Sequence, residues 1–221
     1  LFFDKLNQHK KMSDIVTEMR SKPYNVAERE AGTKLFQKLK RISGEKVPRT
    51  AKPKIKEYQL ALNQTGKRVE YCAKEYFETL GYEVYYAENA LLNGLFGLAF
   101  WQAIFAPIGG AFINQYQYRP LDLYHSDFRI KRHDTIEVCF KQMTDDNAQH
   151  LLEIYHNKAN ISNPFVHWSR FDIHLLKRSI QCIPSRTMIE LFQVLFTDLK
   201  MYTKGTPALS RCQDQNYDWV E

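Results

Sequence analysis

A carboxylate and a proline-containing turn are the features of this sequence best suited to chemistry. The segment Lys204-Gly-Thr-Pro-Ala-Leu209 predicts a turn, and about a dozen residues later Tyr217-Asp-Trp-Val-Glu221 predicts a strand that ends in a carboxylate. Carboxylates on neighbouring strands can bind one or two divalent cations, and such cations polarise a scissile phosphate. Sites of this kind usually take a further acid from an upstream helix or strand end.

A Pro-Asp pair, a spacer and then Glu-x-Lys on a neighbouring strand are typical of nucleases with the restriction-endonuclease fold. The sequence departs from this pattern twice, because Ala208 stands where the aspartate belongs and the sequence stops at Glu221, before the Lys position. Replacing a carboxylate by a methyl group removes a charge and a ligand together, which would slow phosphodiester cleavage by orders of magnitude. Pro-x pairs are common in turns, so this pattern alone is weak evidence.

Four blocks further upstream occur in an order that is more specific than any one of them. They are Arg68-Val-Glu-Tyr-Cys-Ala73, Tyr76-Phe-Glu-Thr-Leu-Gly-Tyr82, Leu95-Phe-Gly-Leu-Ala-Phe-Trp101-Gln-Ala-Ile-Phe105 and Tyr118-Arg-Pro-Leu-Asp-Leu-Tyr124-His-Ser-Asp-Phe128. Glu88 lies between the second block and the third. Together the blocks resemble the Fanconi anaemia-associated nuclease family over roughly residues 66–221.

This resemblance implies an α/β, restriction-endonuclease-like core of the virus-type replication-repair nuclease class, with many helices and more helix than strand. It implies a Mg²⁺- or Mn²⁺-dependent, structure-selective nuclease with 5′-flap endonuclease and 5′-to-3′ exonuclease activity in interstrand-crosslink repair. The catalytic and metal-binding positions would be Glu88, Ala208 and Glu221. The resemblance also implies a pocket for a terminal 5′ phosphate, and Lys200 falls at a basic position of its motif. Without the resemblance, a lone Glu88 would be an exposed acid at a strand end.

The distribution of charge indicates a polyanionic partner, and the resemblance implies that this partner is branched or 5′-flap DNA. The net charge is +6; residues 1–80 contain 18 Lys and Arg against 10 Asp and Glu, whereas the other 141 residues contain 13 against 15. Such basic segments bind phosphates without reading sequence, although a solvated helix face with a Lys-rich linker would look the same. The candidate DNA-binding residues are Arg49, Lys52, Lys54, Arg68, Lys200 and Lys204.

Three regions are expected along the chain. Residues 1–22 predict the tail of an upstream helical domain, residues 23–65 a basic helical linker, and residues 66–221 the nuclease domain, incomplete at its C-terminus. Apolar spacing and caps predict the helices and strands. The expected helices are 25–42, 54–63, 67–80, 91–105, 134–158, 170–182 and 185–201, and the expected strands are 82–87 and 214–221.

The cysteines indicate the compartment, and the most apolar segment indicates whether the chain crosses a membrane. Cys72, Cys139, Cys182 and Cys212 are far apart and form no CxxC pair, which argues against a zinc site or a disulfide scaffold and for a reducing, intracellular compartment, either bacterial cytoplasm or eukaryotic nucleus. The segment 91–108 is interrupted by polar residues and proline, so we expect a buried helix and no membrane span. Its aromatic residues fall at helical spacing, which predicts core packing over base stacking.

Two other classes of function remain open. A non-catalytic basic module would bind branched DNA without a metal, and a helical interaction domain would present its basic face to an acidic protein. A repair-protein partner could also bind through regions outside this sequence. Ala208 would be either an engineered change that traps uncut DNA or a feature of a natural pseudo-enzyme.

Overall fold

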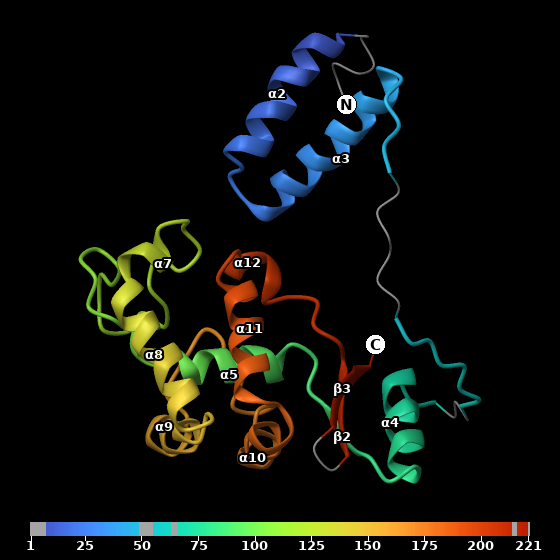
Figure 1. The fold of residues 1–221 in the computed structure, drawn as a ribbon. Coiled ribbons are helices and arrows are strands. Elements are labelled where there is room, and N and C mark those ends of the chain that lie inside the picture. Colours follow the sequence, from blue (N-terminus) through green and yellow to red (C-terminus); the bar gives the residue numbers. More distant parts are fainter. Residues whose placement is uncertain (1–7, 49–54, 63–65, 214–215, 221) are drawn as a thin grey trace. The chain divides into compact units, whose positions relative to one another are not determined.

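The computed structural model describes residues 8–48, 55–62, 66–213 and 216–220 (Figure 1). Its contacts divide the chain into two compact units, Leu1–Gln59 and Leu60–Glu221. The sequence suggested boundaries after residues 22 and 65 instead. The first of those boundaries falls between two helices that pack against each other. Among the helices of the described segments, none combines the length and the apolar composition needed to cross a bilayer.

The first unit contains a helical hairpin of α2 (His9–Ser21) and α3 (Val26–Ile42). Asn25 caps α3, because its side-chain oxygen accepts a hydrogen bond of 2.8 Å from the amide of Glu28. The carboxylate of Glu28 in turn accepts a hydrogen bond from the amide of Tyr24. Such reciprocal capping satisfies amides that the first helical turn leaves free. The predicted helix over 25–42 is therefore confirmed, with its start at the expected cap.

The predicted helix over 54–63 is wrong for the residues that the structure describes there. Residues 55–62 form no regular helix or strand. Most side chains of this segment are exposed, Ile55 and Tyr58 to 77% and 52%, although Leu60 packs against the cluster of Phe77, Val84 and Leu209. A helix of this length is marginal in water without tertiary contacts, which explains the difference.

The second unit contains a three-stranded antiparallel sheet next to α4. The elements are α4 (Val69–Thr79), β1 (Glu83–Tyr86), β2 (Leu209–Gln213) and β3 (Asn216–Val220), and the strand order is β1-β2-β3. Tyr86 pairs with Leu209, and Leu209 pairs on its other side with Val220. The expected strands at 82–87 and 214–221 are confirmed in their described parts, whereas the sequence did not predict the central strand β2.

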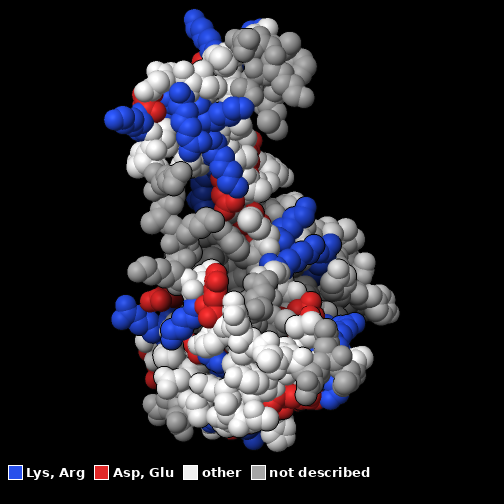
Figure 2. Space-filling model, turned by 90° about the vertical axis from the view of Figure 1, so that its right-hand side faces the viewer, with Lys and Arg blue, Asp and Glu red and all other residues white. Residues whose placement is uncertain are grey.

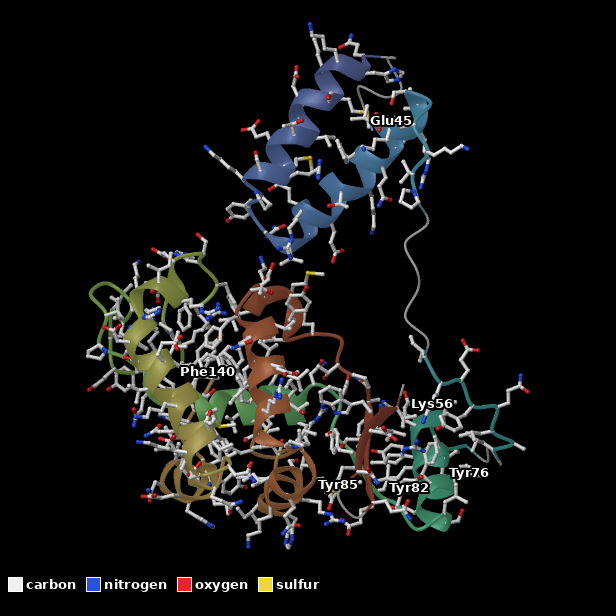
Figure 3. All side chains as sticks on the ribbon, viewed as in Figure 1. Glu45, Lys56, Tyr76, Tyr82, Tyr85 and Phe140 are labelled. Carbon is white, nitrogen blue, oxygen red and sulfur yellow. A yellow bond between two sulfur atoms is a disulfide. The ribbon has the colours of Figure 1, made fainter. Side chains whose placement is uncertain are left out.

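One face of the sheet packs against α4. Phe77, Val84 and Leu209 form a small buried cluster there, and Tyr76 and Tyr82 pack against it (Figure 3). Arg211 of β2 is also buried on this face; its guanidinium lies 4.5 Å from the ring centroid of Phe77 and pairs with a carboxylate of β3. Burial of an arginine requires such partners, so β2 could not be recognised from local hydrophobicity.

The other face of the sheet packs against a helical core. Its helices are α5 (Ala90–Ala99), α6 (Trp101–Ile104), α7 (Phe128–Lys131), α8 (His133–Asp145), α9 (His150–Lys158), α10 (Ile173–Cys182), α11 (Ser185–Leu195) and α12 (Leu199–Tyr202). Phe96 and Phe100 are fully buried at its centre, and the ring centroid of Phe140 lies 4.9 Å from that of Phe100 (Figure 3). The expectation that these aromatic residues form core is confirmed.

Several predicted helices are interrupted. The helix expected over 134–158 divides into α8 and α9, because Asn147 and Ala148 have φ values of 51° and 65°, outside the right-handed helical region. The helix expected over 185–201 divides into α11 and α12, since Asp198 adopts an extended conformation and caps α12 through the amide of Met201. The helix expected over 91–105 divides into α5 and α6 at Phe100.

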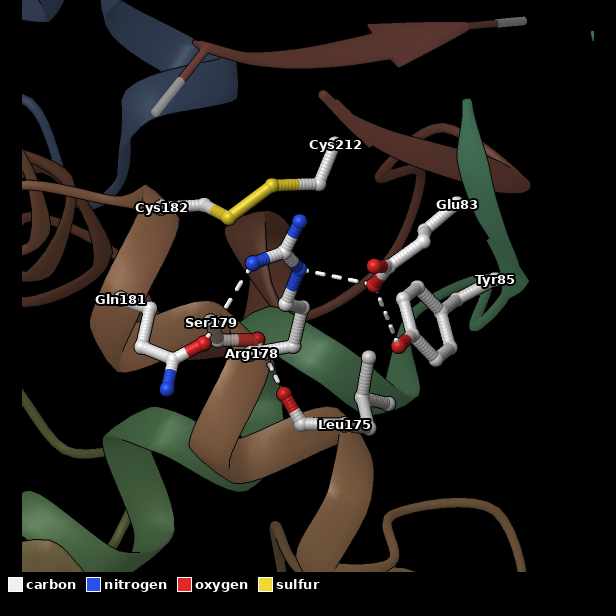
Figure 4. The surroundings of a disulfide bond; sticks show 8 residues. All are labelled: Glu83, Tyr85, Leu175, Arg178, Ser179, Gln181, Cys182 and Cys212. Carbon is white, nitrogen blue, oxygen red and sulfur yellow. Dashed lines mark hydrogen bonds and ion pairs between the residues drawn. A yellow bond between two sulfur atoms is a disulfide. The ribbon is translucent and has the colours of Figure 1, made fainter. Parts of the chain in front are cut away.

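A disulfide joins Cys182, the last residue of α10, to Cys212 of β2 (Figure 4). The expectation that the cysteines form no disulfide is therefore wrong for this pair. The two residues are 30 positions apart, and their Cα atoms approach to 6.6 Å only because β2 lies next to α10. Arg178 of α10 adds an ion pair of 2.7 Å to Glu83 of β1, so α10 contacts both strands.

Candidate functional site

Glu88 and Ala208 meet where β1 ends and β2 begins. The carbonyl oxygen of Ala208 accepts hydrogen bonds from the amides of Ala87 (3.1 Å) and Glu88 (3.0 Å). These bonds extend the β1–β2 pairing past Tyr86 and Leu209. The antiparallel pairing therefore brings together two of the three positions that the resemblance assigns to catalysis. We call the residues around these bonds, 86–89 and 205–208, the corner.

The backbone of Glu88 has an unusual conformation. Its φ is 39°, in the left-handed region that residues with a side chain seldom adopt. The hydroxyl of Thr206 lies 3.0 Å from the carbonyl oxygen of Glu88 and 3.1 Å from Oδ1 of Asn89, and the amide of Thr206 donates to the same Oδ1 at 3.0 Å. Strained backbone persists where the surroundings hold it and is concentrated at functional sites.

The carboxylate of Glu88 is partly exposed and has two polar neighbours. Its Oε2 atom lies 3.5 Å from a guanidinium nitrogen of Arg170 and 3.5 Å from the hydroxyl of Tyr86. The side chain of Glu88 is 43% exposed and that of Arg170 is 62% exposed. Both contacts are long, so the carboxylate is free to accept another cationic partner. Arg170 is 82 positions away in the sequence, and no local pattern there could have identified it.

The described part of the corner does not by itself form a metal site. Ala208 ends in a methyl group, which cannot ligate a cation, and the predicted ligand Glu221 lies outside the described residues. Within the described segments, no three His, Cys, Asp or Glu side chains lie in an arrangement that could hold a metal ion. A divalent cation prefers several oxygen ligands, and Glu88 is the carboxylate that the described corner supplies.

The predicted DNA-binding residues fall into two groups. Arg49, Lys52 and Lys54 lie outside the described residues, whereas Arg68, Lys200 and Lys204 are exposed. Arg68 precedes α4. Figure 2 shows that Lys and Arg side chains also gather over the helical hairpin of the first unit. Exposed cations of this kind can meet phosphates at low desolvation cost.

The turn that contains Lys204 is anchored on both sides, at Thr203 and Thr206, whereas Lys200 precedes it in α12. The side-chain amide of Asn93 in α5 donates 2.9 Å to the carbonyl of Thr203. Thr206 bonds to Asn89, just before α5. The two anchors fix the connection from α12 to β2 and so fix the backbone leading to position 208. The sequence identified this connection as a turn but gave no indication of Asn89 and Asn93 as its partners.

Behind the sheet, Tyr217 and Trp219 of β3 pack against the helical core, and the indole nitrogen of Trp219 donates to the hydroxyl of Tyr217 at 2.6 Å. Burial raises the pKa of Tyr217, so this phenol stays neutral. The strand that leads to residue 221 is therefore held by an uncharged, packed face.

The fold is an α/β, restriction-endonuclease-like nuclease core in which helix exceeds strand, as the sequence predicted. No protein-family model matches the chain. A Fanconi-associated nuclease 1 homolog of Pseudomonas aeruginosa is 32% identical over 199 residues, which cover 88% of this chain and 36% of that protein. A homolog of the same name from Schizosaccharomyces pombe is 28% identical over 144 residues, which cover 64% of this chain and 20% of that protein.

Comparison with solved structures points to the same family as the sequence relatives. The crystal structure of paFAN1 bound to 2nt 5′ flap DNA with gap aligns with a TM-score of 0.87 and 30% identity, over 99% of this chain and 41% of that one. A second structure, of paFAN1 bound to 1nt 5′ flap DNA with gap, aligns with a TM-score of 0.83. The chain belongs to the Fanconi-associated nuclease family. It spans about a third of the length of the first relative named above.

Proposed function

We propose that the chain is part of a structure-selective DNA nuclease that cleaves branched DNA near 5′ flaps and also degrades DNA from 5′ ends. The proposal rests above all on the hydrogen bond between the amide of Glu88 and the carbonyl of Ala208, since this pairing joins two separated acid positions of the family at one corner. It is supported by the likeness to proteins whose structures contain 5′-flap DNA.

The proposed reaction depends on Mg²⁺ or Mn²⁺, with Glu88, an acid at position 208 and Glu221 as the ligands. In this chain, position 208 has no carboxylate, so we propose that cleavage is slow by orders of magnitude whereas DNA binding persists. Most of the binding free energy would come from cations remote from position 208, because phosphate contacts dominate affinity for DNA.

The proposed DNA contacts are Arg49, Lys52, Lys54, Arg68, Lys200 and Lys204. Lys200 and Lys204 are of particular interest because the turn that follows Lys200 is anchored at Asn93 of α5 and at Asn89 of the corner. A cation held close to Glu88 can balance the charge of a phosphate there. Replacing one phosphate-binding lysine should weaken binding to every DNA sequence alike and lower the salt slope by about one.

The biological setting is part of the same proposal. A nuclease of this family would act inside the cell in interstrand-crosslink repair, in bacterial cytoplasm or a eukaryotic nucleus. Protein partners would contact regions that this sequence does not include.

Two measurements on the same protein test the proposal. Gel-shift titrations at two salt concentrations should show tighter binding to a 5′-flap substrate than to blunt duplex of equal length. Ala208→Asp should then cleave the flap substrate when Mg²⁺ or Mn²⁺ is added, while the double variant with Glu88→Gln should not. Equal affinity for flap and blunt DNA, together with no cleavage by Ala208→Asp, would refute the nuclease proposal.

A non-catalytic DNA-binding module is the second candidate. It is favoured by one specific observation, the methyl group of Ala208 at the corner. It predicts flap-selective binding that survives in Ala208→Asp without any metal-dependent cleavage, which is also the result expected of a natural pseudo-enzyme.

A further inference from the structure

A groove lined by aromatic residues lies in the second unit, away from the corner. It has a volume of about 600 Å³, and its walls come from the end of α6, the loop 112–118 and residues 161–162. Tyr116 and Ile113 are 87% and 75% exposed, and Tyr118 is 52% exposed. Figure 1 shows the loops around α7 at the opposite end of this unit from the sheet. Clustered exposed apolar side chains of this kind mark interaction sites.

The loop that presents these side chains is held by its own hydrogen bonds. The side-chain nitrogen of Gln117 donates to the carbonyls of Ala111 (2.9 Å) and Arg119 (2.6 Å), and its oxygen accepts from the amide of Ile113 (3.1 Å). The amide of Leu121 closes the loop on the carbonyl of Ala111 at 2.8 Å. Tyr116 and Tyr118 are thus exposed on an ordered scaffold, and binding would require little ordering of the loop.

The end of the loop is anchored in the core. Asp122 and Arg132 form a buried ion pair with two hydrogen bonds of 2.7 Å and 3.0 Å. The rings of Phe105 and Phe112, which also line the groove, stack with their centroids 6.1 Å apart. The loop is therefore held at its end by a buried ion pair, and two stacked rings form part of the groove's lining.

The charge around the groove is positive. The guanidinium of Arg119 lies 5.5 Å from the ring of Tyr118 and 5.1 Å from the ring of Tyr124. In the segments 105–126 and 156–170, the single acidic residue is Asp122, which is buried and paired with Arg132. An acidic protein helix and a nucleic acid would both fit a positive surface. Flat aromatic rings with amide side chains at Asn114 and Gln115 favour stacked bases with polar edges.

We propose that this groove binds unpaired nucleotides of single-stranded DNA, whose bases stack on Tyr116 and Tyr118 while Arg119 contacts the adjoining phosphate. The inference rests on the proposed function, because a flap contains an unpaired strand. Base–aromatic stacking tolerates any sequence, since every base has a π face. A flap nuclease needs this tolerance.

The test uses an oligothymidine with one 2-aminopurine, a base whose fluorescence is quenched on stacking. The unmodified protein should quench the probe, and Tyr116→Ala with Tyr118→Ala should lose the quenching and bind the oligonucleotide at least about thirtyfold more weakly, since two stacking contacts are removed. The salt slope of binding should stay the same in this variant, because its phosphate contacts remain. Arg119→Gln should instead lower the salt slope by about one.

Two control variants keep the result specific. Tyr24→Ala removes an aromatic side chain that is 88% exposed in the first unit, and it should leave quenching and affinity unchanged. Tyr116→Phe keeps a ring in the groove and should quench as the unmodified protein does.

Unchanged quenching and affinity in the double alanine variant would overturn the inference and leave a protein partner as the occupant. If quenching and affinity are unchanged in the double alanine variant but the unmodified protein binds flap DNA more tightly than blunt duplex, the proposed function stays intact. Equal affinity for flap and blunt DNA and no cleavage by Ala208→Asp, with the quenching pattern as expected, would instead overturn the proposed function alone.

Discussion

The amide of Glu88 donates a hydrogen bond of 3.0 Å to the carbonyl oxygen of Ala208. With the neighbouring bond from the amide of Ala87, this contact joins the end of β1 to the start of β2 across 120 positions of sequence. Because the bond is made by backbone atoms, it does not depend on which side chain occupies position 208. A carboxylate placed at 208 would therefore be built onto the same frame beside Glu88.

Ala208→Asp is expected to create metal affinity that the unmodified protein lacks. The new carboxylate adds an oxygen ligand and a negative charge next to Glu88, and hard cations bind such oxygens. Isothermal titration with Mn²⁺ measures the change without any reaction. Asparagine has nearly the same shape as aspartate but no charge, so Ala208→Asn should bind Mn²⁺ much more weakly than Ala208→Asp. Equal Mn²⁺ binding by all three proteins would contradict the expectation.

Thr206→Val is expected to destabilise the corner by about 1 kcal/mol, since it removes a hydroxyl that bonds to the carbonyl of Glu88. Denaturant unfolding measures this loss. Thr197→Val is the matched control, because its hydroxyl bonds to a carbonyl at the exposed end of α11 and should matter less. A loss in Thr197→Val as large as in Thr206→Val would show that the corner has no special need of the hydroxyl.

Asp122→Asn is expected to lower stability by about 3 kcal/mol or more, because Arg132 is 1% exposed and would keep an unbalanced buried charge. Glu190→Gln offers the comparison. Its partner Arg186 is 90% exposed, so breaking that pair should change the free energy of unfolding little. Thermal and denaturant unfolding of both variants give the two numbers.

The thiol of Cys139 gives a pH-dependent prediction. Burial raises its pKa from 9.0 to about 11, so the folded protein keeps the proton while the unfolded chain loses it from about pH 9. This group therefore contributes stability in full below pH 9 and loses that contribution as the pH rises towards 11. In the native protein at pH 8, iodoacetamide should leave Cys139 unmodified, as peptide mass spectrometry would show; rapid labelling without unfolding would disprove it.

The sequence predicted the helices whose apolar residues recur at helical spacing, such as the segment around Phe96 and Phe100. It also led to Glu88 and position 208, although through ordered blocks of sequence and not through either residue alone. Local patterns could not reveal β2, because Ser210 and Arg211 are polar but buried, and Arg211 is buried beside Phe77 of α4 and paired with Asp218 of β3.

The sequence also could not predict contacts between residues that lie far apart in the chain. Arg170 reaches Glu88 from a loop whose neighbouring residues predict nothing about a carboxylate. Cys182 and Cys212 have no informative spacing, and they meet because α10 ends beside β2. In each case the partner is chosen by the tertiary fold, which no local periodicity describes.

The bond between the sulfur atoms of Cys182 and Cys212 closes a covalent ring in the chain. Lys200, Lys204 and Ala208 all belong to this ring, together with α11 and α12. A protease that cut once between α11 and α12 would thus release no fragment at that cut until a thiol reductant opened the ring. Both cut ends would stay tethered, one through α10 and the other through the middle strand of the sheet.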